Sequence, residues 1–346
     1  MAEPADDDIY AALDLGTNNC RLLIAYPSFR MTKNGRSLKA IDSFSRIVRL
    51  GEGVSSSDVL SEEAMERTIH ALRTCQRKLE RYALTRTRFV ATEACRRAAN
   101  AAEFTKRVQD ELGLSLEIIT NEEEARLALL GCCSLLQPGV QRALAFDIGG
   151  GSTEIMWVAT PPAYYAQQPA QFPFHPDLMG WMSMPYGVMN LSEQFGHNEY
   201  ASLYFEDIVA KVTERLAPFA KKHAISEILG DVPTQLLSTS GTVTTLAAVH
   251  MNLPRYDRSR VDGISLPAEK LRATIAQLLA MRPSERFNHP CIGPDRSDFI
   301  IAGCAILEAL LRSFSFPQVT IADRGVREGI IISLMLREQD QQESAA

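Results

Sequence analysis

The sequence of 346 residues lacks the cysteine and histidine patterns of a disulfide framework or a zinc knuckle. Its seven cysteines are odd in number, and no two of them have C-x-x-C spacing. The six histidines are scattered and form no H-E-x-x-H pattern. Scattered thiols suit a reducing compartment, so the sequence argues against a disulfide-stabilised or zinc-bound protein.

Long apolar runs are missing as well. The first residues, MAEPADDD, are acidic where a signal peptide is basic. The longest apolar runs, near residues 300–311 and 329–336, fall short of the roughly 18 residues that span a bilayer. We therefore expect a cytoplasmic protein with no membrane partner.

The chain also lacks an excess of positive charge. The chain has 36 Lys and Arg against 42 Asp and Glu, a net charge of −6. This balance argues against a nucleic-acid partner held by bulk positive charge. Hydrophobic residues make up 46% and charged residues 23%, which is typical of a globular chain, and at about 150 residues per domain the length predicts two domains.

A strand-turn-strand pattern occurs twice in the chain. Residues 9–14 and 21–26 are apolar around a small polar turn, and residues 143–147 and 154–159 repeat this arrangement. Asp14 at the end of the first strand recurs as Asp147, 133 residues later. The repeat indicates two related halves, and the alternation of strands and helices elsewhere predicts an α/β or mixed α+β fold.

Both turns are rich in glycine and small polar residues. Backbone N–H groups of such a loop form a concavity that suits phosphate oxygens. Three consecutive glycines are costly in a folded chain and make sense where a ligand approaches the backbone closely. A plain hairpin turn explains either loop alone, but the pair is more specific. The candidate phosphate-binding residues are Gly16, Thr17, Asn18, Gly149, Gly150, Gly151 and Ser152.

Two further segments could bind phosphate. A strand at residues 235–238 leads into a helix start at Gly241 and Thr242, where free N–H groups and the helix dipole favour anions. A plain N-cap explains that segment equally well. Arg96 follows another strand, and a guanidinium binds phosphate through paired hydrogen bonds, although a solvated surface charge is as good an explanation.

A run of three glutamates opens a helix near residue 121. With Asn121 as N-cap, Glu124 falls at the third helical position, which is the pattern of a capping box. The functional alternative is a carboxylate that orients and deprotonates water. Spacing alone does not decide whether Glu123 or Glu124 is that base.

These motifs, taken in order, resemble the exopolyphosphatase / guanosine pentaphosphate phosphohydrolase (Ppx/GppA) family within the actin-like ATPase superfamily. The resemblance covers about residues 9–336. It implies an α/β, actin-like (ribonuclease H-like) fold of two domains with an interdomain cleft. The first domain would comprise residues 1–125, with a C-terminal helix at about 320–340 packing back on it, and the second residues 126–315.

The resemblance also implies roles for the candidate residues. The two glycine loops would hold the terminal phosphates, and Arg21 and Arg96 would contact phosphate oxygens. Glu124 matches the catalytic glutamate that activates water for in-line attack. Asp147 and Glu154 match carboxylates that bind Mg²⁺ or another divalent cation, with Asp14 as a further candidate. A homodimer is implied in the same way.

Two departures from the family stand out. Long members carry a further helical region resembling an HD-type phosphohydrolase domain, and this sequence has no His-Asp dipeptide, so we expect a short form. A proline-rich insertion at residues 160–176 has no assigned role. The substrate is expected to be inorganic polyphosphate or guanosine pentaphosphate, and the sequence does not rank the two. An actin-like small-molecule kinase and a non-enzymatic polyphosphate or alarmone sensor are the alternatives.

Overall fold

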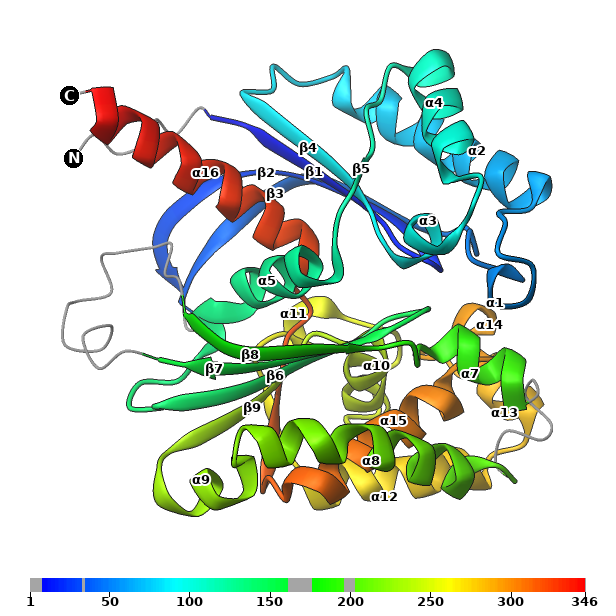
Figure 1. The fold of residues 1–346 in the computed structure, drawn as a ribbon, viewed down its shortest axis with the longest axis vertical. Coiled ribbons are helices and arrows are strands. Elements are labelled where there is room, and N and C mark those ends of the chain that lie inside the picture. The colour runs from blue at the N-terminus through cyan, green and yellow to red at the C-terminus, as the bar shows by residue number, and fades with distance from the viewer. Residues whose placement is uncertain (1–7, 33–34, 161–175, 196–202, 346) are drawn as a thin grey trace. The chain divides into compact units, whose positions relative to one another are not determined.

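The computed structural model describes residues 8–32, 35–160, 176–195 and 203–345, which form two compact units (Figure 1). The first unit contains the described residues up to 134 and those from 324 onward, and the second contains those between 135 and 323. Almost all of the proline-rich insertion lies outside the described residues. No helix among the described residues is long and apolar enough to cross a membrane.

The first unit is built on a five-stranded sheet with the order β3-β2-β1-β4-β5. β2 runs antiparallel to β1 and β3, whereas β4 runs parallel to β1 and β5 parallel to β4. Its elements are β1 (Tyr10–Leu15), β2 (Asn19–Thr32), β3 (Gly35–Ile47), α1 (Val54–Ser57), α2 (Glu62–Leu79), β4 (Arg86–Ala91), α3 (Glu93–Arg97), α4 (Ala101–Leu112), β5 (Glu117–Ile118), α5 (Asn121–Cys132) and α16 (Val326–Ala345).

Both faces of this sheet are covered by helices (Figure 1). Because successive side chains of a strand point to opposite faces, β1 contributes to two cores. Leu13 and Leu15 pack with apolar residues of α2 and α4, while Tyr10 and Ala12 pack with those of α5 and α16. The last helix therefore completes the first unit. It meets α5 so closely that a Cβ at Gly329 would overlap the backbone of α5.

The second unit has a six-stranded sheet with the order β10-β11-β9-β6-β7-β8. Apolar side chains of β6 and β7 pack against α8, α10, α12 and α15. Its elements are β6 (Arg142–Ile148), β7 (Thr153–Ala159), β8 (Asp177–Met184), α7 (Val188–Phe195), α8 (Phe205–Lys222), α9 (Ile225–Asp231), β9 (Thr234–Ser238), α10 (Gly241–His250), α11 (Arg258–Val261), β10 (Ser265–Pro267), α12 (Ala268–Ala280), α13 (Pro283–Asn288), α14 (Pro294–Ser297), α15 (Ile300–Phe314) and β11 (Gln318–Ile321); a 3₁₀ turn, Cys133–Leu135, joins the units.

The two sheets repeat one topology. The run β8-β7-β6-β9-β11 has the same order and strand directions as β3-β2-β1-β4-β5. The register repeats as well, since Asp14 lies opposite Arg21 and Asp147 lies opposite Glu154. This confirms the expected α/β fold and gives the weak repeat in the sequence a structural basis.

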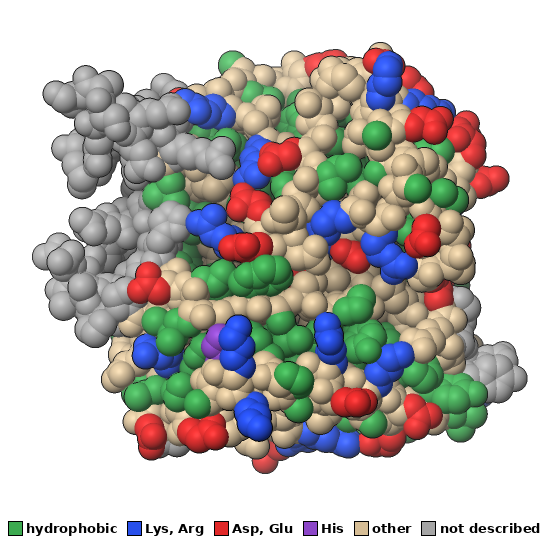
Figure 2. All heavy atoms as spheres, in the orientation of Figure 1, with side chains coloured by type: hydrophobic (Ala, Val, Ile, Leu, Met, Phe, Trp, Pro, Cys, Tyr) green, Lys and Arg blue, Asp and Glu red, His purple; other side chains and the backbone are tan. Residues whose placement is uncertain are grey.

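Charges of both signs are mixed on the surface. On the face drawn in Figure 2, acidic and basic side chains alternate over short distances and no broad basic area stands out. This agrees with the net charge of −6. Affinity for a polyanion would have to come from local features of the fold.

Candidate functional site

The carbonyl groups of the loop between β1 and β2 are bound by backbone N–H groups of the protein. The loop closes with a hydrogen bond from the Gly16 N–H to the Asn19 carbonyl, 2.9 Å. The carbonyl of Thr17 accepts from the Gly51 N–H, and that of Asn18 accepts from the N–H groups of residues 48 and 49. No protein acceptor for the N–H groups of Thr17 and Asn18 is found among the described residues. Such N–H groups are suited to an anion.

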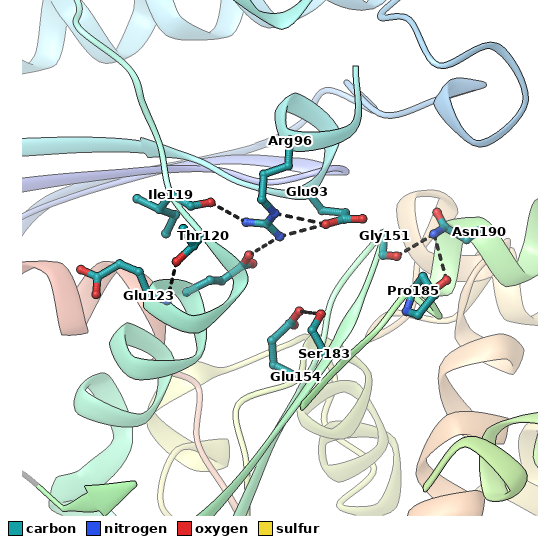
Figure 3. A network of polar contacts seen from close by, with 11 residues as sticks. Glu93, Arg96, Ile119, Thr120, Glu123, Gly151, Glu154, Ser183, Pro185 and Asn190 are labelled. Atoms are coloured by element: carbon teal, nitrogen blue, oxygen red, sulfur yellow. Dashed lines mark hydrogen bonds and ion pairs between the residues drawn. The ribbon is translucent and has the colours of Figure 1, made fainter. Parts of the chain in front are cut away.

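The loop between β6 and β7 has the same construction. The Gly149 N–H donates to the Ser152 carbonyl over 2.9 Å, as in the first loop. The first turn of α7 then takes three consecutive carbonyls: Val188 N–H binds Gly149, Met189 N–H binds Gly150, and the Asn190 side chain binds Gly151 over 2.6 Å (Figure 3). Within the described part of the chain, no acceptor is found for the N–H groups of Gly150 and Gly151.

Gly187 explains why α7 comes so close to this loop. A Cβ at Gly187 would overlap the carbonyl group of Gly150 and the nitrogen of Gly151, so only glycine fits. Sequence analysis missed Gly187, because the contact joins residues 37 positions apart and leaves no local pattern.

Gly187→Ala is expected to push the glycine loop away from α7 and to raise KM for a phosphate substrate roughly tenfold, because misplacement of about 1 Å is costly at a binding site. The measurement is steady-state kinetics of phosphate release. Gly139→Ala is the control, since Gly139 has φ +82° in open space and its substitution strains the fold without touching the loop. An unchanged KM in a folded Gly187→Ala variant would contradict the role of this contact.

The start of α10 lies beside the same glycine loop. Ser240 caps the helix by accepting from the Thr242 N–H over 3.1 Å, and its hydroxyl donates to the Ile148 carbonyl over 3.4 Å. The plain N-cap considered from the sequence is therefore present. The position of a Cβ on Gly241 would have no atom within 4 Å, so there is space beside the helix start. In the second unit, Gly149–Ser152 and Gly241–Thr242 are thus brought together.

Asp147 and Glu154 form a carboxylate pair next to this loop. They face each other across the antiparallel strands β6 and β7, so their Cβ atoms are about 5 Å apart on one side of the sheet. Glu154 is only 2% exposed and accepts a hydrogen bond from the Ser183 hydroxyl on β8 over 2.9 Å. Figure 3 shows this contact. Sequence analysis did not find Ser183.

The ligand type of this pair, two carboxylates, suits Mg²⁺. The residues that the structure describes contain no group of three or more His, Cys, Asp or Glu side chains arranged as a metal site. Mg²⁺ is, however, commonly bound through one or two carboxylates together with substrate phosphates and water. Two facing carboxylates, one of them oriented by a serine hydroxyl, match that pattern.

Asp14 occupies the corresponding position in the first unit. Burial raises the pKa of the Asp14 carboxyl, and the nearby charges of Arg21 and Arg327 act against this rise, while Glu328 adds to it. A buried carboxylate of this kind would be stabilised by a cation. Arg327 and Glu328 lie in the first turn of α16.

Asn18 supplies a further indication of a ligand in the first unit. Its side-chain amide oxygen is buried, and no hydrogen-bond donor is found for it among the described residues. Buried polar groups in native proteins are nearly always satisfied. A bound group at the loop of Gly16–Asn18 would meet this need, in agreement with the expectation from the sequence.

Arg96 and Glu124 contact each other directly. The Nη2 group of Arg96 donates to Glu124 Oε2 over 2.7 Å and to Glu93 Oε2 over 3.0 Å, and Nη1 donates to the Ile119 carbonyl over 2.9 Å (Figure 3). Arg96 was expected to contact phosphate. In this structure most of its hydrogen bonds go to the candidate base and to Glu93, a residue for which the sequence predicted no role.

The start of α5 differs from the expectation. The N-cap is Thr120, whose hydroxyl accepts from the Glu123 N–H over 3.2 Å, and Asn121 is the first helical residue. The capping-box assignment of Asn121 and Glu124 is therefore wrong by one position. Thr and Asn are both favourable N-cap residues, so residue type alone does not decide between Thr120 and Asn121. The backbone conformation after β5 does, because Thr120 is extended, as an N-cap is, and Asn121 is already helical.

Glu123 and Glu124, the two candidate bases, bind different arginines. Glu123 binds Arg88 through Oε1 over 2.9 Å and Arg126 through Oε2 over 3.5 Å. Arg88 is itself held by Glu117 through two contacts. Glu123 thus belongs to an ion-pair network that joins α5, β4 and β5, whereas Glu124 belongs to the cluster around Arg96.

Comparisons with known proteins agree with the arrangement of these motifs. The model of the Ppx/GppA phosphatase family matches residues 31–338. Exopolyphosphatase 2 of Mycobacterium tuberculosis (strain ATCC 25618 / H37Rv) is 30% identical over 338 residues, which are 94% of this chain and 98% of that protein.

Solved structures are similar over the same extent. The crystal structure of the Aquifex aeolicus member of the Ppx/GppA family has a TM-score of 0.71 at 28% identity, covering 96% of this chain and 98% of that one. An exopolyphosphatase from Cytophaga hutchinsonii ATCC 33406 has a TM-score of 0.79 at 23% identity, covering 94% of this chain and 97% of that one, and supports the fold alone.

Proposed function

Because the chain belongs to the Ppx/GppA phosphatase family, we propose that it is a phosphoanhydride hydrolase that releases the terminal phosphate of inorganic polyphosphate. Relatives at about 30% identity bear the name exopolyphosphatase, which supports this substrate. The observation that carries the proposal is the pair of matching loops. In each, the described part of the protein binds loop carbonyl groups and leaves two N–H groups that an anion could bind.

In the proposed reaction, a water oxygen forms a bond to the terminal phosphorus as the bond from phosphorus to the bridging oxygen breaks. Glu124 orients the water and takes its proton, and the shortened polyphosphate leaves with the bridging oxygen. The N–H groups of the two loops and Arg21 bind the phosphate oxygens. Arg21 lies opposite Asp14, at the position that Glu154 occupies in the second unit. The repeat therefore has an arginine at this position in one unit and a glutamate, the proposed metal ligand, in the other.

A divalent cation, most simply Mg²⁺, would be held by Asp147 and Glu154 of the second unit. The family resemblance makes Asp14 of the first unit a further candidate ligand. When bound, it would neutralise charge on the phosphates. Magnesium, a cytoplasmic location and a homodimer are predictions that the family membership leaves open.

A panel of four substrates tests the proposed function: short polyphosphate, long polyphosphate, guanosine pentaphosphate and ATP. Release of phosphate from polyphosphate in the presence of Mg²⁺ is the expected result. Turnover of guanosine pentaphosphate alone would indicate that the protein is a guanosine pentaphosphate phosphohydrolase and not an exopolyphosphatase. Transfer from ATP to a small acceptor would favour a kinase, and tight binding without turnover would favour a sensor.

Ser183→Ala is expected to raise the Mg²⁺ concentration needed for half-maximal activity about tenfold. Its hydroxyl orients Glu154, and removing the hydrogen bond that orients a metal ligand typically costs 10- to 100-fold in affinity or activity. A Mg²⁺ titration of activity measures this. Ser265→Ala, which removes a hydroxyl contact to Thr320 at the other edge of the same sheet, is the control and should leave the titration unchanged. If Ser183→Ala needs the same Mg²⁺ concentration for half-maximal activity as wild type, the Ser183 hydroxyl does not orient Glu154 as a metal ligand.

A further inference from the structure

The guanidinium of Arg96 is fixed on three sides. Glu93 Oε2 accepts from Nε over 3.2 Å and from Nη2 over 3.0 Å. Glu124 Oε2 accepts from the same Nη2 over 2.7 Å, and the Ile119 carbonyl accepts from Nη1. A guanidinium has five N–H donors, so these contacts leave one N–H, on Nη1, without an acceptor in the described part of the chain. That donor is sufficient for one phosphate oxygen.

The cluster is largely withdrawn from solvent. The side chains of Arg96, Glu93 and Glu124 are 14%, 13% and 15% exposed. Burial alone would lower the pKa of Arg96, but the charges and hydrogen bonds of Glu124 and Glu93 raise it above its ordinary value. Arg96 therefore stays charged, and it separates two carboxylates that would otherwise repel each other.

Glu93 is tied to Arg96 by the local chain path. The two residues are three positions apart on α3, which brings their side chains to one face of the helix. The Thr92 N–H donates to the Leu15 carbonyl over 3.1 Å, which fixes the start of α3 to the end of β1. Glu93 is thus held to the same strand end that carries the first phosphate-binding loop.

We propose that Glu93 is a positioning residue that acts on the reaction through Arg96 and Glu124. Without Glu93, only Glu124 and the Ile119 carbonyl would hold the guanidinium, each through one Nη group, and Nε would have no acceptor to limit its movement. Glu93 bridges Nε and Nη2 and limits that movement, so the Glu124 carboxylate is presented to water in one orientation. This inference rests on the proposed function, in which Glu124 activates the attacking water.

The competing explanation is a helix-surface ion pair that contributes only to stability. Glu285, which pairs with Arg282 three residues away over 2.9 Å, is such a pair and provides a matched control. A pair of that kind would change the melting temperature slightly and leave kcat and KM as they are.

The test measures kcat and KM for phosphate release, together with the melting temperature Tm of each protein. The proteins compared are wild type, Glu93→Ala, Glu93→Gln, Glu285→Ala, Glu124→Ala and the double variant Glu93→Ala/Glu124→Ala. We expect kcat of Glu93→Ala to fall roughly 10- to 100-fold with KM within about threefold of wild type, because a small displacement of a catalytic group has effects of this size. Glu93→Gln keeps an acceptor for Nε and Nη2 and should recover most of the loss. The double variant should equal Glu124→Ala, because residues that act as a unit are not additive.

A wild-type kcat in Glu93→Ala would overturn the inference. So would a loss that multiplies with that of Glu124→Ala, or a change confined to KM. If Glu93→Ala does not fold, Glu93→Asp tests the positioning role instead. This variant keeps the negative charge but shortens the side chain by one methylene, so kcat should fall roughly tenfold. An unchanged kcat in Glu93→Asp would refute the positioning role. Full activity in Glu124→Ala would instead overturn the proposed function, whatever Glu93 does.

Discussion

Glu124→Ala is expected to lower kcat for phosphate release about 10³-fold while leaving the fold intact. Loss of a positioned general base typically costs 10²- to 10⁴-fold. Glu124 lies in the first turn of α5 and is not one of the buried residues of that helix, so its shortening removes no side chain from the apolar core. The measurement is colorimetric phosphate release from polyphosphate with Mg²⁺, accompanied by a thermal melt.

Glu123→Ala is the matched control, because it removes the same side chain one position earlier. It breaks the contacts with Arg88 and Arg126 and should alter stability slightly while kcat stays within about threefold of wild type. The reverse outcome, a large loss in Glu123→Ala and activity in Glu124→Ala, would exchange the two roles. The sequence left this choice open, and the structure makes it testable by assigning the two carboxylates to different arginines.

The parts of the fold that could be predicted from the sequence are those set by neighbouring residues. The two hairpins were predicted because an apolar strand, a small polar turn and a second strand follow one another directly. In the structure both loops have four residues, enclosed by the pairs Leu15–Cys20 and Ile148–Thr153. The helix start at Gly241 was predicted in the same way, from a strand that runs into a glycine and a segment rich in hydroxyl side chains.

The parts that could not be predicted depend on contacts between distant segments. Gly187 supports the glycine loop, Ser183 orients Glu154, and the Ile119 carbonyl binds Arg96, but each of these contacts joins residues more than 20 positions apart. Glu93 is closer to Arg96 in the chain, yet its role depends on Glu124 lying on the other side of the guanidinium. Residue type alone does not distinguish it from a surface charge.

Removal of divalent cations is the second change with a large expected effect. Excess EDTA should lower phosphate release at least about 10³-fold, and added Mg²⁺ should restore it. The candidate base and metal ligands are all carboxylates, Asp14 and Glu124 in the first unit and Asp147 and Glu154 in the second. The chain has a net charge of −6, and a polyphosphate brings further negative charge. A metal ion contributes several kcal/mol to the stabilisation of transferring phosphates, and about 4 kcal/mol corresponds to a 10³-fold change in rate.

The expected loss must come from the reaction and not from unfolding, so the melting temperature is measured with and without EDTA in the absence of substrate. The cores between the two sheets and their helices consist of apolar side chains, so Tm should change little. Glu154→Gln should reproduce the loss at low Mg²⁺ and recover part of it at high Mg²⁺, since Asp147 remains. Full activity in excess EDTA would contradict the assignment of Asp147 and Glu154 as metal ligands and would require the loops and arginines alone to neutralise the phosphates.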